Sequence, residues 1–166
     1  MSEKPQRCGT GRVCVVTAGG PHPWCIINAL ADHFEDVHVI VEDSERRGAF
    51  LARRARLQGR FTVAGQFGTM CLIGVGKALF RRRIARIISS EGLRAEPRAG
   101  LPIRKIASVN SGDFLRAIDE IRPSVILLAG CRILRPDALA GITCPVLNYH
   151  AGITPRYRGM NSGYWA

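Results

Sequence analysis

Two short apolar runs that flank a glycine turn and a helical pattern constrain the fold most strongly. The runs are Val13–Ala18 and Val37–Glu42. Continuous apolar runs of this length are typical of strands that are buried on both faces of a sheet. Between them, Gly19 and Gly20 turn the chain, and Pro23 suits the first turn of a helix because its missing N–H costs nothing there. The order of strand, turn, helix and strand predicts a parallel pair with a right-handed crossover.

The second half of the chain continues the alternation of strands and helices. Its patterns predict strands at Ile103–Val109, Ser124–Gly130 and Pro145–His150, a helix that Ser111 caps, and a short helical turn at Pro136–Leu139. A chain of 166 residues is long enough for one domain with a substantial core. We therefore predict an α/β fold, an open and mostly parallel Rossmann-like sheet with helices on both faces.

The middle of the chain is strongly basic and less regular. Arg46–Gln58 and Lys77–Glu91 have helical patterns, whereas the glycines between residues 61 and 76 break both periodicities. The whole chain has 24 Lys and Arg against 13 Asp and Glu, which gives a formal net charge of +11. Such a charge suits an anionic partner such as phosphate, nucleotide or RNA, although a bias in composition alone would produce the same value.

The same region contains an apolar stretch followed by arginines, a pattern that also occurs where a helix crosses a membrane. The stretch extends from Phe61 to Arg86. A spanning segment needs a nearly uninterrupted apolar run, and Gln66, Lys77 and several glycines interrupt this one. We therefore expect no contact with a membrane.

The six cysteines indicate neither a metal site nor a disulfide framework. No two of them are spaced as in metal sites or redox pairs, and most lie in apolar runs, where a free thiol behaves as a small hydrophobic group. Residues 1–11 lack the apolar core of a signal peptide. We expect them to form a mobile leader before a domain at residues 12–166, in a reduced, cytoplasmic protein without a bound metal.

Three segments that directly follow predicted strands are the candidates for chemistry. They are Thr17–Pro21, Gly130–Leu134 and Asn148–Gly159. Ligands of open α/β sheets bind outside the carboxyl ends of the strands, so these segments should meet at one edge of the sheet. Asn148 and His150 lie two residues apart, which in a strand places them on the same face. Histidine transfers protons near neutral pH and an asparagine amide can donate to a developing oxyanion. By spacing alone, the pair fits a catalytic centre or two satisfied loop residues.

The last segment also resembles a family signature. Residues 144–166, CPVLNYHAGITPRYRGMNSGYWA, are similar to the signature of the 10-formyltetrahydrofolate-dependent formyltransferases, which reads Asn-x-His, two residues, an apolar pair, Pro, two residues and Gly. SVILLAGCRIL and RVCVVTAGG resemble the family's preceding strand with its folate loop and its first strand. The resemblance implies that Asn148 and His150 bind the formyl group during transfer. It further implies that the folate pocket is lined by Arg132, Ile133 and Leu134. Gly19 and Gly20 are expected to face the acceptor.

Three departures from the family pattern bear on this interpretation. Gly152 stands where family members usually have Ser, and Ile153–Pro155 replaces a Leu-Leu-Pro run. The turn at Gly19 and Gly20 differs from the phosphate loop of the family's purine-pathway member. Two glycines before a helix either admit a phosphate to backbone N–H groups or simply turn the chain. The family's catalytic Asp is expected beyond Ala166. We accordingly expect a C-terminally truncated fragment of the domain, inactive by itself.

The resemblance implies transfer of a formyl group from 10-formyltetrahydrofolate to a primary amine. The acceptor is expected to be an amino sugar nucleotide or the aminoacyl end of a tRNA, and the second would suit the arginine surplus. An alternative from another class is a non-catalytic α/β domain that binds RNA or another anionic partner. Its contacts would be arginines of the middle region: Arg46, Arg47, Arg53, Arg54, Arg81, Arg82 and Arg83.

Overall fold

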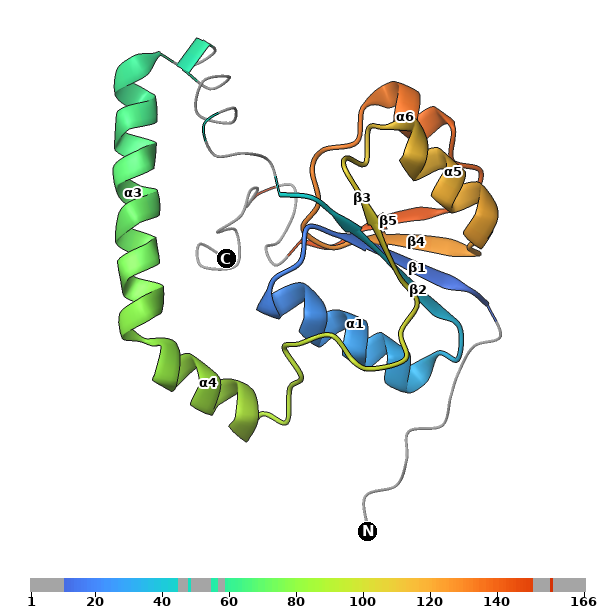
Figure 1. The fold of residues 1–166 in the computed structure, drawn as a ribbon, viewed down its shortest axis with the longest axis horizontal. Helices are drawn as coiled ribbons and strands as arrows, with labels where there is room; N and C mark the ends of the chain where they lie inside the picture. Colours follow the sequence, from blue (N-terminus) through green and yellow to red (C-terminus); the bar gives the residue numbers. More distant parts are fainter. Residues whose placement is uncertain (1–10, 45–47, 49–54, 57–58, 151–155, 157–166) are drawn as a thin grey trace. The chain divides into compact units, whose positions relative to one another are not determined.

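The computed structural model describes residues 11–44, 48, 55–56, 59–150 and 156, and the chain divides into two compact units. One unit contains the residues up to Asp43 and those from Ala95 onward, and the other contains residues 44–94. The strands belong to the first unit, whereas the described part of the second is helical (Figure 1). Residues 1–10 of the predicted leader lie outside the described residues.

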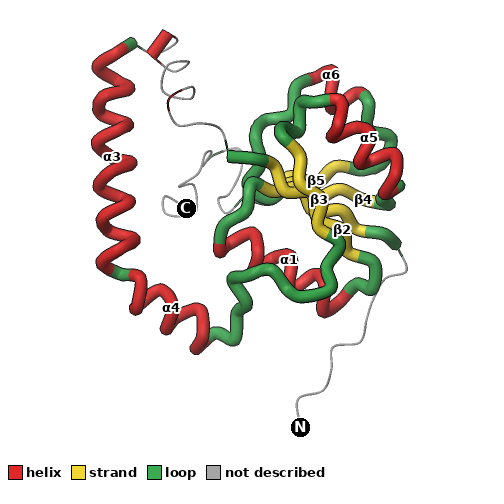
Figure 2. The backbone as a smooth tube through the Cα atoms, in the orientation of Figure 1, coloured by secondary structure: helices red, strands yellow, loops and turns green. Residues whose placement is uncertain are grey.

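The first unit is built on a sheet of five parallel strands (Figures 1 and 2). The strands are β1 (Val13–Thr17), β2 (Val37–Glu42), β3 (Ile103–Ile106), β4 (Val125–Leu128) and β5 (Val146–Asn148). Their order is β3-β2-β1-β4-β5, and each neighbouring pair is parallel. From β1 the chain adds strands first on one side and later on the other, which is the doubly wound arrangement of Rossmann-like folds. The predicted open, parallel α/β sheet is therefore confirmed.

Helix α1, Pro21–His33, covers one face of the sheet (Figure 1). Side chains alternate between the two faces along a strand, and in β1 Val13 and Val15 belong to the face that α1 covers. There they lie in one buried cluster with Trp24 and Ile27 of the helix. The helix begins two residues before the predicted Pro23, since Pro21 also tolerates the first turn.

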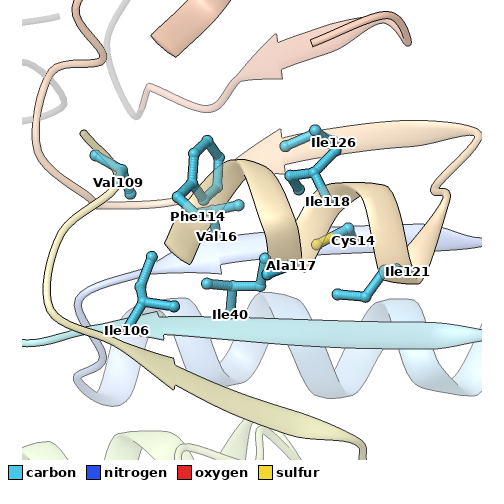
Figure 3. Packing of buried hydrophobic residues seen from close by; sticks show 10 residues of the cluster. All are labelled: Cys14, Val16, Ile40, Ile106, Val109, Phe114, Ala117, Ile118, Ile121 and Ile126. Carbon is cyan, nitrogen blue, oxygen red and sulfur yellow. The ribbon is translucent and has the colours of Figure 1, made fainter. Parts of the chain in front are cut away.

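Helix α5, Gly112–Ile121, covers the opposite face. The alternate residues of β1, Cys14 and Val16, lie in one buried cluster with Phe114 of this helix (Figure 3). Phe114 is among the largest completely buried side chains of the chain. A short helix, α6 (Pro136–Ala140), follows β4 where a helical turn was predicted. Helices on both faces of the sheet are therefore confirmed.

The predicted side-chain cap of α5 is wrong in its mechanism, although Ser111 does stand at the N-cap position. Its hydroxyl donates to the carbonyl oxygen of Ser108 at 2.6 Å, and so forms no cap hydrogen bond with the helix. The first turn is instead closed by the backbone N–H of Phe114, which donates to the carbonyl oxygen of Ser111 at 3.1 Å. Local hydrogen bonds of serine commonly compete with capping in this way.

The second unit contains two consecutive helices, α3 (Arg60–Leu79) and α4 (Arg81–Ser90). The helix predicted at Lys77–Glu91 is interrupted at Phe80, whose backbone leaves the helical region with φ −93° and ψ 7°. The glycine-rich stretch before it is helical. The helix predicted at Arg46–Gln58 lies largely outside the described residues. Within the part of the chain that the structure describes, no helix is both long and apolar enough to cross a membrane.

Candidate active site

The described parts of the candidate segments follow β1, β4 and β5, whose carboxyl ends lie at one edge of the sheet because all its strands run in the same direction. β1 and β4 are neighbours at the centre of the sheet, and the connections that follow them lead to opposite sides. Open α/β sheets bind ligands in the crevice at such a switch point. The first two segments are hydrogen-bonded there, since the N–H of Ala18 donates to the carbonyl oxygen of Gly130 at 3.1 Å. The loops that follow β1 and β4 therefore adjoin at the switch point.

The turn after β1 depends on its two glycines. Gly19 and Gly20 have φ angles of 82° and 106°, a region that other residues adopt only with strain. The N–H of Gly19 donates to the side-chain oxygen of Thr17 at 3.0 Å, which closes the turn before α1 begins. An added Cβ at either glycine would meet no atom within 4 Å, so it is the backbone conformation that demands glycine here. The turn also leaves open space beside the switch point.

A buried carboxylate that the sequence analysis did not single out organises the loop after β4. Glu42 ends β2 and is completely buried. One of its oxygens accepts the N–H of Val109 at 3.0 Å, and the other accepts the N–H of Arg132 at 2.9 Å. β3 stops at Ile106, short of the predicted Val109, because Val109 bonds to this carboxylate instead of extending the strand. The sequence contains one sign of this role, because Glu42 is an acidic residue at the end of an otherwise apolar strand.

The side chain of Arg132 is engaged with the same carboxylate. Its guanidinium lies 3.2 Å from Glu42 and also donates to the carbonyl oxygens of Ala107 and Asp43, at 3.2 and 2.6 Å. These contacts tie the loop after β4 to the ends of β2 and β3. Because the charge of Arg132 is already paired, its side chain is better suited to fixing the loop than to binding a ligand directly.

The other two residues of the predicted folate pocket point in different directions. Ile133 has 92% of its surface exposed, whereas Leu134 packs against the core cluster under α5. The side chain of Asn110 holds the backbone on both sides of Leu134. It donates to the carbonyl oxygen of Ile133 at 3.0 Å and accepts the N–H of Arg135 at 2.7 Å. Ile133 is therefore an apolar side chain presented to solvent by a fixed backbone.

Asn148 and His150 are both exposed beside this loop. Asn148 ends β5 and pairs with Leu128 at the end of β4. The predicted strand stops short of His150, but the N–H of Tyr149 still donates to the carbonyl oxygen of Leu128 at 2.9 Å. Val146, two residues before Asn148, packs against the cluster under α5, and strand alternation places Asn148 on that same face. An amide donor and an imidazole are thus available at the carboxyl end of the strand.

Between them, Tyr149 contacts the start of α1. Its ring lies 5.5 Å from the ring of His22, and the phenol oxygen lies 3.5 Å from Nε2 of that histidine. This contact joins the third candidate segment to the start of α1, directly after the first segment, across 127 residues of sequence. His22 was missed because only the glycines of its turn were considered. Its position in the sequence, directly after a predicted strand and its glycine turn, would have identified His22 as a candidate.

Two groups near the loop after β4 have shifted pKa values. Burial, assisted by the nearby charge of Glu42, raises the pKa of Cys131 to about 11. This thiol is therefore neutral at physiological pH and a poor nucleophile. A hydrogen bond from Arg135 lowers the pKa of Asp137, which is exposed at the start of α6. Among the residues that the structure describes, no three His, Cys, Asp or Glu side chains are grouped so that they could hold a metal ion.

Comparisons with known proteins identify several methionyl-tRNA formyltransferases as relatives. The chain is 35% identical over 60 residues to the methionyl-tRNA formyltransferase of Chlorobium phaeovibrioides, covering 36% of this chain and 19% of that protein. It is 33% identical over 66 residues to the enzyme of Chlorobium chlorochromatii, covering 40% and 21%. It is 26% identical over 85 residues to the enzyme of Campylobacter jejuni, covering 51% and 28%. No family model matches the chain. No solved structure matches it either.

The strand order and the helices on both faces define a doubly wound α/β domain, and the candidate residues follow the carboxyl ends of its strands. The similarity to these enzymes confirms the predicted resemblance to the formyltransferases. The matched segments span about a fifth to a quarter of the length of the curated relatives.

Proposed function

We propose that the protein transfers a formyl group from 10-formyltetrahydrofolate to a primary amine, with Asn148 and His150 at the catalytic centre. The observation that carries the proposal is the exposure of this pair at the carboxyl end of β5, beside the loop after β4. The relatedness to formyltransferases supports the reaction type.

In the proposed reaction, Asn148 and protonated His150 donate hydrogen bonds to the formyl oxygen as the acceptor amine attacks the formyl carbon. These donors stabilise the negative charge that develops on that oxygen. The new C–N bond to the acceptor forms, and the bond from the formyl carbon to the donor nitrogen breaks. In this proposal, protonated His150 gives its proton to the departing nitrogen and then takes up the proton that the amine loses.

The loop after β4 is the proposed binding site for the folate. Ile133 offers an exposed apolar side chain, which suits the flat ring of a pteridine. Arg132 acts through Glu42, since their ion pair fixes the loop, and Leu134 anchors the loop in the core. The acceptor would approach the turn at Gly19 and Gly20, where even an added Cβ would meet no described atom within 4 Å.

The aminoacyl end of a tRNA is the acceptor that the comparisons support best, because the relatives are named methionyl-tRNA formyltransferases. The net charge of +11 is favourable for a polyanionic acceptor. An amino sugar nucleotide is the other acceptor class implied by the sequence. Formylation assays with an aminoacyl-tRNA and with an amino sugar nucleotide, under the same conditions, would separate the two.

Two measurements test the proposed catalytic centre. His150→Ala should lower turnover by roughly two or more orders of magnitude, the scale of losing an acid–base group, while leaving folate affinity nearly unchanged. His33→Ala is the matched control, because His33 is also exposed but lies at the far end of α1. Near-normal turnover of His150→Ala would remove this residue from the mechanism.

The donor site is tested by ligand-dependent stability. Tetrahydrofolate at about a hundredfold excess over its dissociation constant should stabilise the protein by about 2.7 kcal/mol. Ile133→Asp should abolish this effect without lowering the stability of the free protein, because the side chain is exposed. A folded protein that saturating tetrahydrofolate does not stabilise would contradict the proposed donor.

A further inference from the structure

The helical unit carries basic charge without acidic charge over two complete helices. Residues 60–90 contain no Asp or Glu, and their basic residues are Arg60, Lys77, Arg81, Arg82, Arg83 and Arg86. A segment of one charge sign is complementary to an anionic surface.

Helix α4 holds three of its four arginines apart from its isoleucines. At 100° per residue, Arg82, Arg83 and Arg86 fall within one arc of about 100°, and Ile84, Ile87 and Ile88 fall within another, with Arg81 beside the second arc. Ile84 and Ile87 are exposed, and α4 has no buried residue. Strong amphipathicity with a basic polar face is typical of helices that lie in a membrane interface.

Helix α3 adds an exposed apolar stripe. Phe61, Leu72, Val75 and Leu79 fall on one side at helical spacing. Phe61 is 97% exposed, Leu79 75% and Leu72 73%. Exposure of so many large apolar side chains along one helix marks a surface that another phase or partner covers.

We propose that α3 and α4 bind an anionic lipid surface, with the apolar side chains of both helices in the interface and the arginines on the headgroups. This proposal does not depend on the proposed formyl transfer. It departs from the expectation of no membrane contact. That expectation concerned a helix that spans the membrane, whereas the exposed apolar side chains of α3 and α4 suit a helix that lies on its surface. A helix too short in apolar length to span is still able to lie in the interface.

A lipid surface explains more of these observations than RNA does. RNA would pair its phosphates with the arginines of α4 and could stack bases on Phe61. It would leave exposed to water the apolar side chains Leu72, Val75 and Leu79 of α3 and Ile84 and Ile87 of α4. An anionic bilayer accommodates both groups, since its headgroups take the arginines and its acyl boundary takes the aliphatic side chains.

The first test measures cosedimentation with vesicles of phosphatidylglycerol and phosphatidylcholine. The protein should bind these vesicles and not vesicles of phosphatidylcholine alone. Each arginine near an anionic surface strengthens binding about fivefold, so the triple variant R82Q/R83Q/R86Q should bind roughly a hundred times more weakly. The matched control R98Q/R104Q/R116Q removes the same charge from ion-paired arginines of the sheet unit, and should retain most of the binding.

The second test separates lipid from RNA. The variant Leu72→Asn with Leu79→Asn should weaken vesicle binding by about tenfold or more, because each leucine loses its apolar burial in the interface. Both side chains are exposed, so folding should be unaffected. With a single-stranded RNA as probe, this variant should behave as the unmodified protein does.

Three outcomes would overturn the proposal. One is the absence of binding to phosphatidylglycerol vesicles. Another is vesicle binding that the α4 triple variant and the sheet-unit control weaken equally. The third is RNA binding that depends on the α4 arginines in a protein that ignores the vesicles, which would assign the helical unit to RNA.

Discussion

Replacement of Glu42 by Gln changes the charge of the carboxylate but hardly its size. In the native protein the two oxygens accept the N–H groups of Val109 and Arg132 and pair with the guanidinium of Arg132. In Glu42→Gln, the amide oxygen satisfies one of these donors. The amide NH2 then faces a second donor, so that one buried N–H is left without an acceptor and the guanidinium loses its counter-charge.

The expected loss of stability follows from these contacts. An orphaned buried donor costs about 1–3 kcal/mol, and breaking a buried ion pair by removing one partner costs about 3–5 kcal/mol. The two figures overlap, because the same carboxylate serves both, and Arg132 keeps 29% of its side-chain surface in water. We therefore expect the free energy of unfolding to fall by about 3 kcal/mol, a large part of the stability of a typical domain.

Urea denaturation followed by circular dichroism measures this loss. Glu120→Gln is the matched control, because Glu120 also pairs with an arginine, Arg104, but is 63% exposed, and its removal should change stability little. Adding Arg132→Met to Glu42→Gln should cost less than the sum of the two single changes. If Glu42→Gln proves as stable as Glu120→Gln, the loop after β4 is not held by this carboxylate and the reasoning fails.

Three further predictions concern the core and the thiols. Phe114→Ala should lower the free energy of unfolding by about 3–5 kcal/mol in the same assay, because it empties a fully buried site; a loss near zero would mean that this core is not tightly packed. Iodoacetamide at pH 8 should label the exposed Cys71 and spare Cys14, because burial raises the pKa of Cys14 to about 12. Mass spectrometry measures the labelling, and equal labelling of both thiols would contradict the buried position of Cys14. Stability should also decline as the pH rises above about 9, because the unfolded chain then loses thiol protons that Cys14 and Cys131 keep in the folded state; stability that rises there would contradict these pKa shifts.

Elements whose structure follows from local pattern were predicted closely. The strand Val37–Glu42 has the predicted bounds, because an unbroken apolar run between turns has few other places in a small α/β fold. The last strand was predicted at Pro145–His150 and lies within these bounds, but it ends at Asn148, two residues before His150. By contrast, the break at Phe80 was not predicted, because the helical periodicity of Lys77–Glu91 continues through this residue.

The contacts that shape the candidate site could not be predicted, because they join residues far apart in sequence. Glu42 and Arg132 are 90 residues apart, and His22 and Tyr149 are 127 apart. Neither pair leaves a periodic trace in the chain, and each member alone has ordinary explanations as a strand end or a turn residue. Their pairing follows only once the order of the strands is known.

The helical unit is inserted into the connection between β2 and β3, two strands that are neighbours in the sheet. Closing a flexible connection costs conformational entropy that grows only with the logarithm of its length, so that each doubling adds about 0.6 kcal/mol. The sheet therefore tolerates a long, a short or an exchanged segment at this point with little change in its own folding free energy. Whatever α3 and α4 bind, they can change in sequence and length largely independently of the residues that form the switch point.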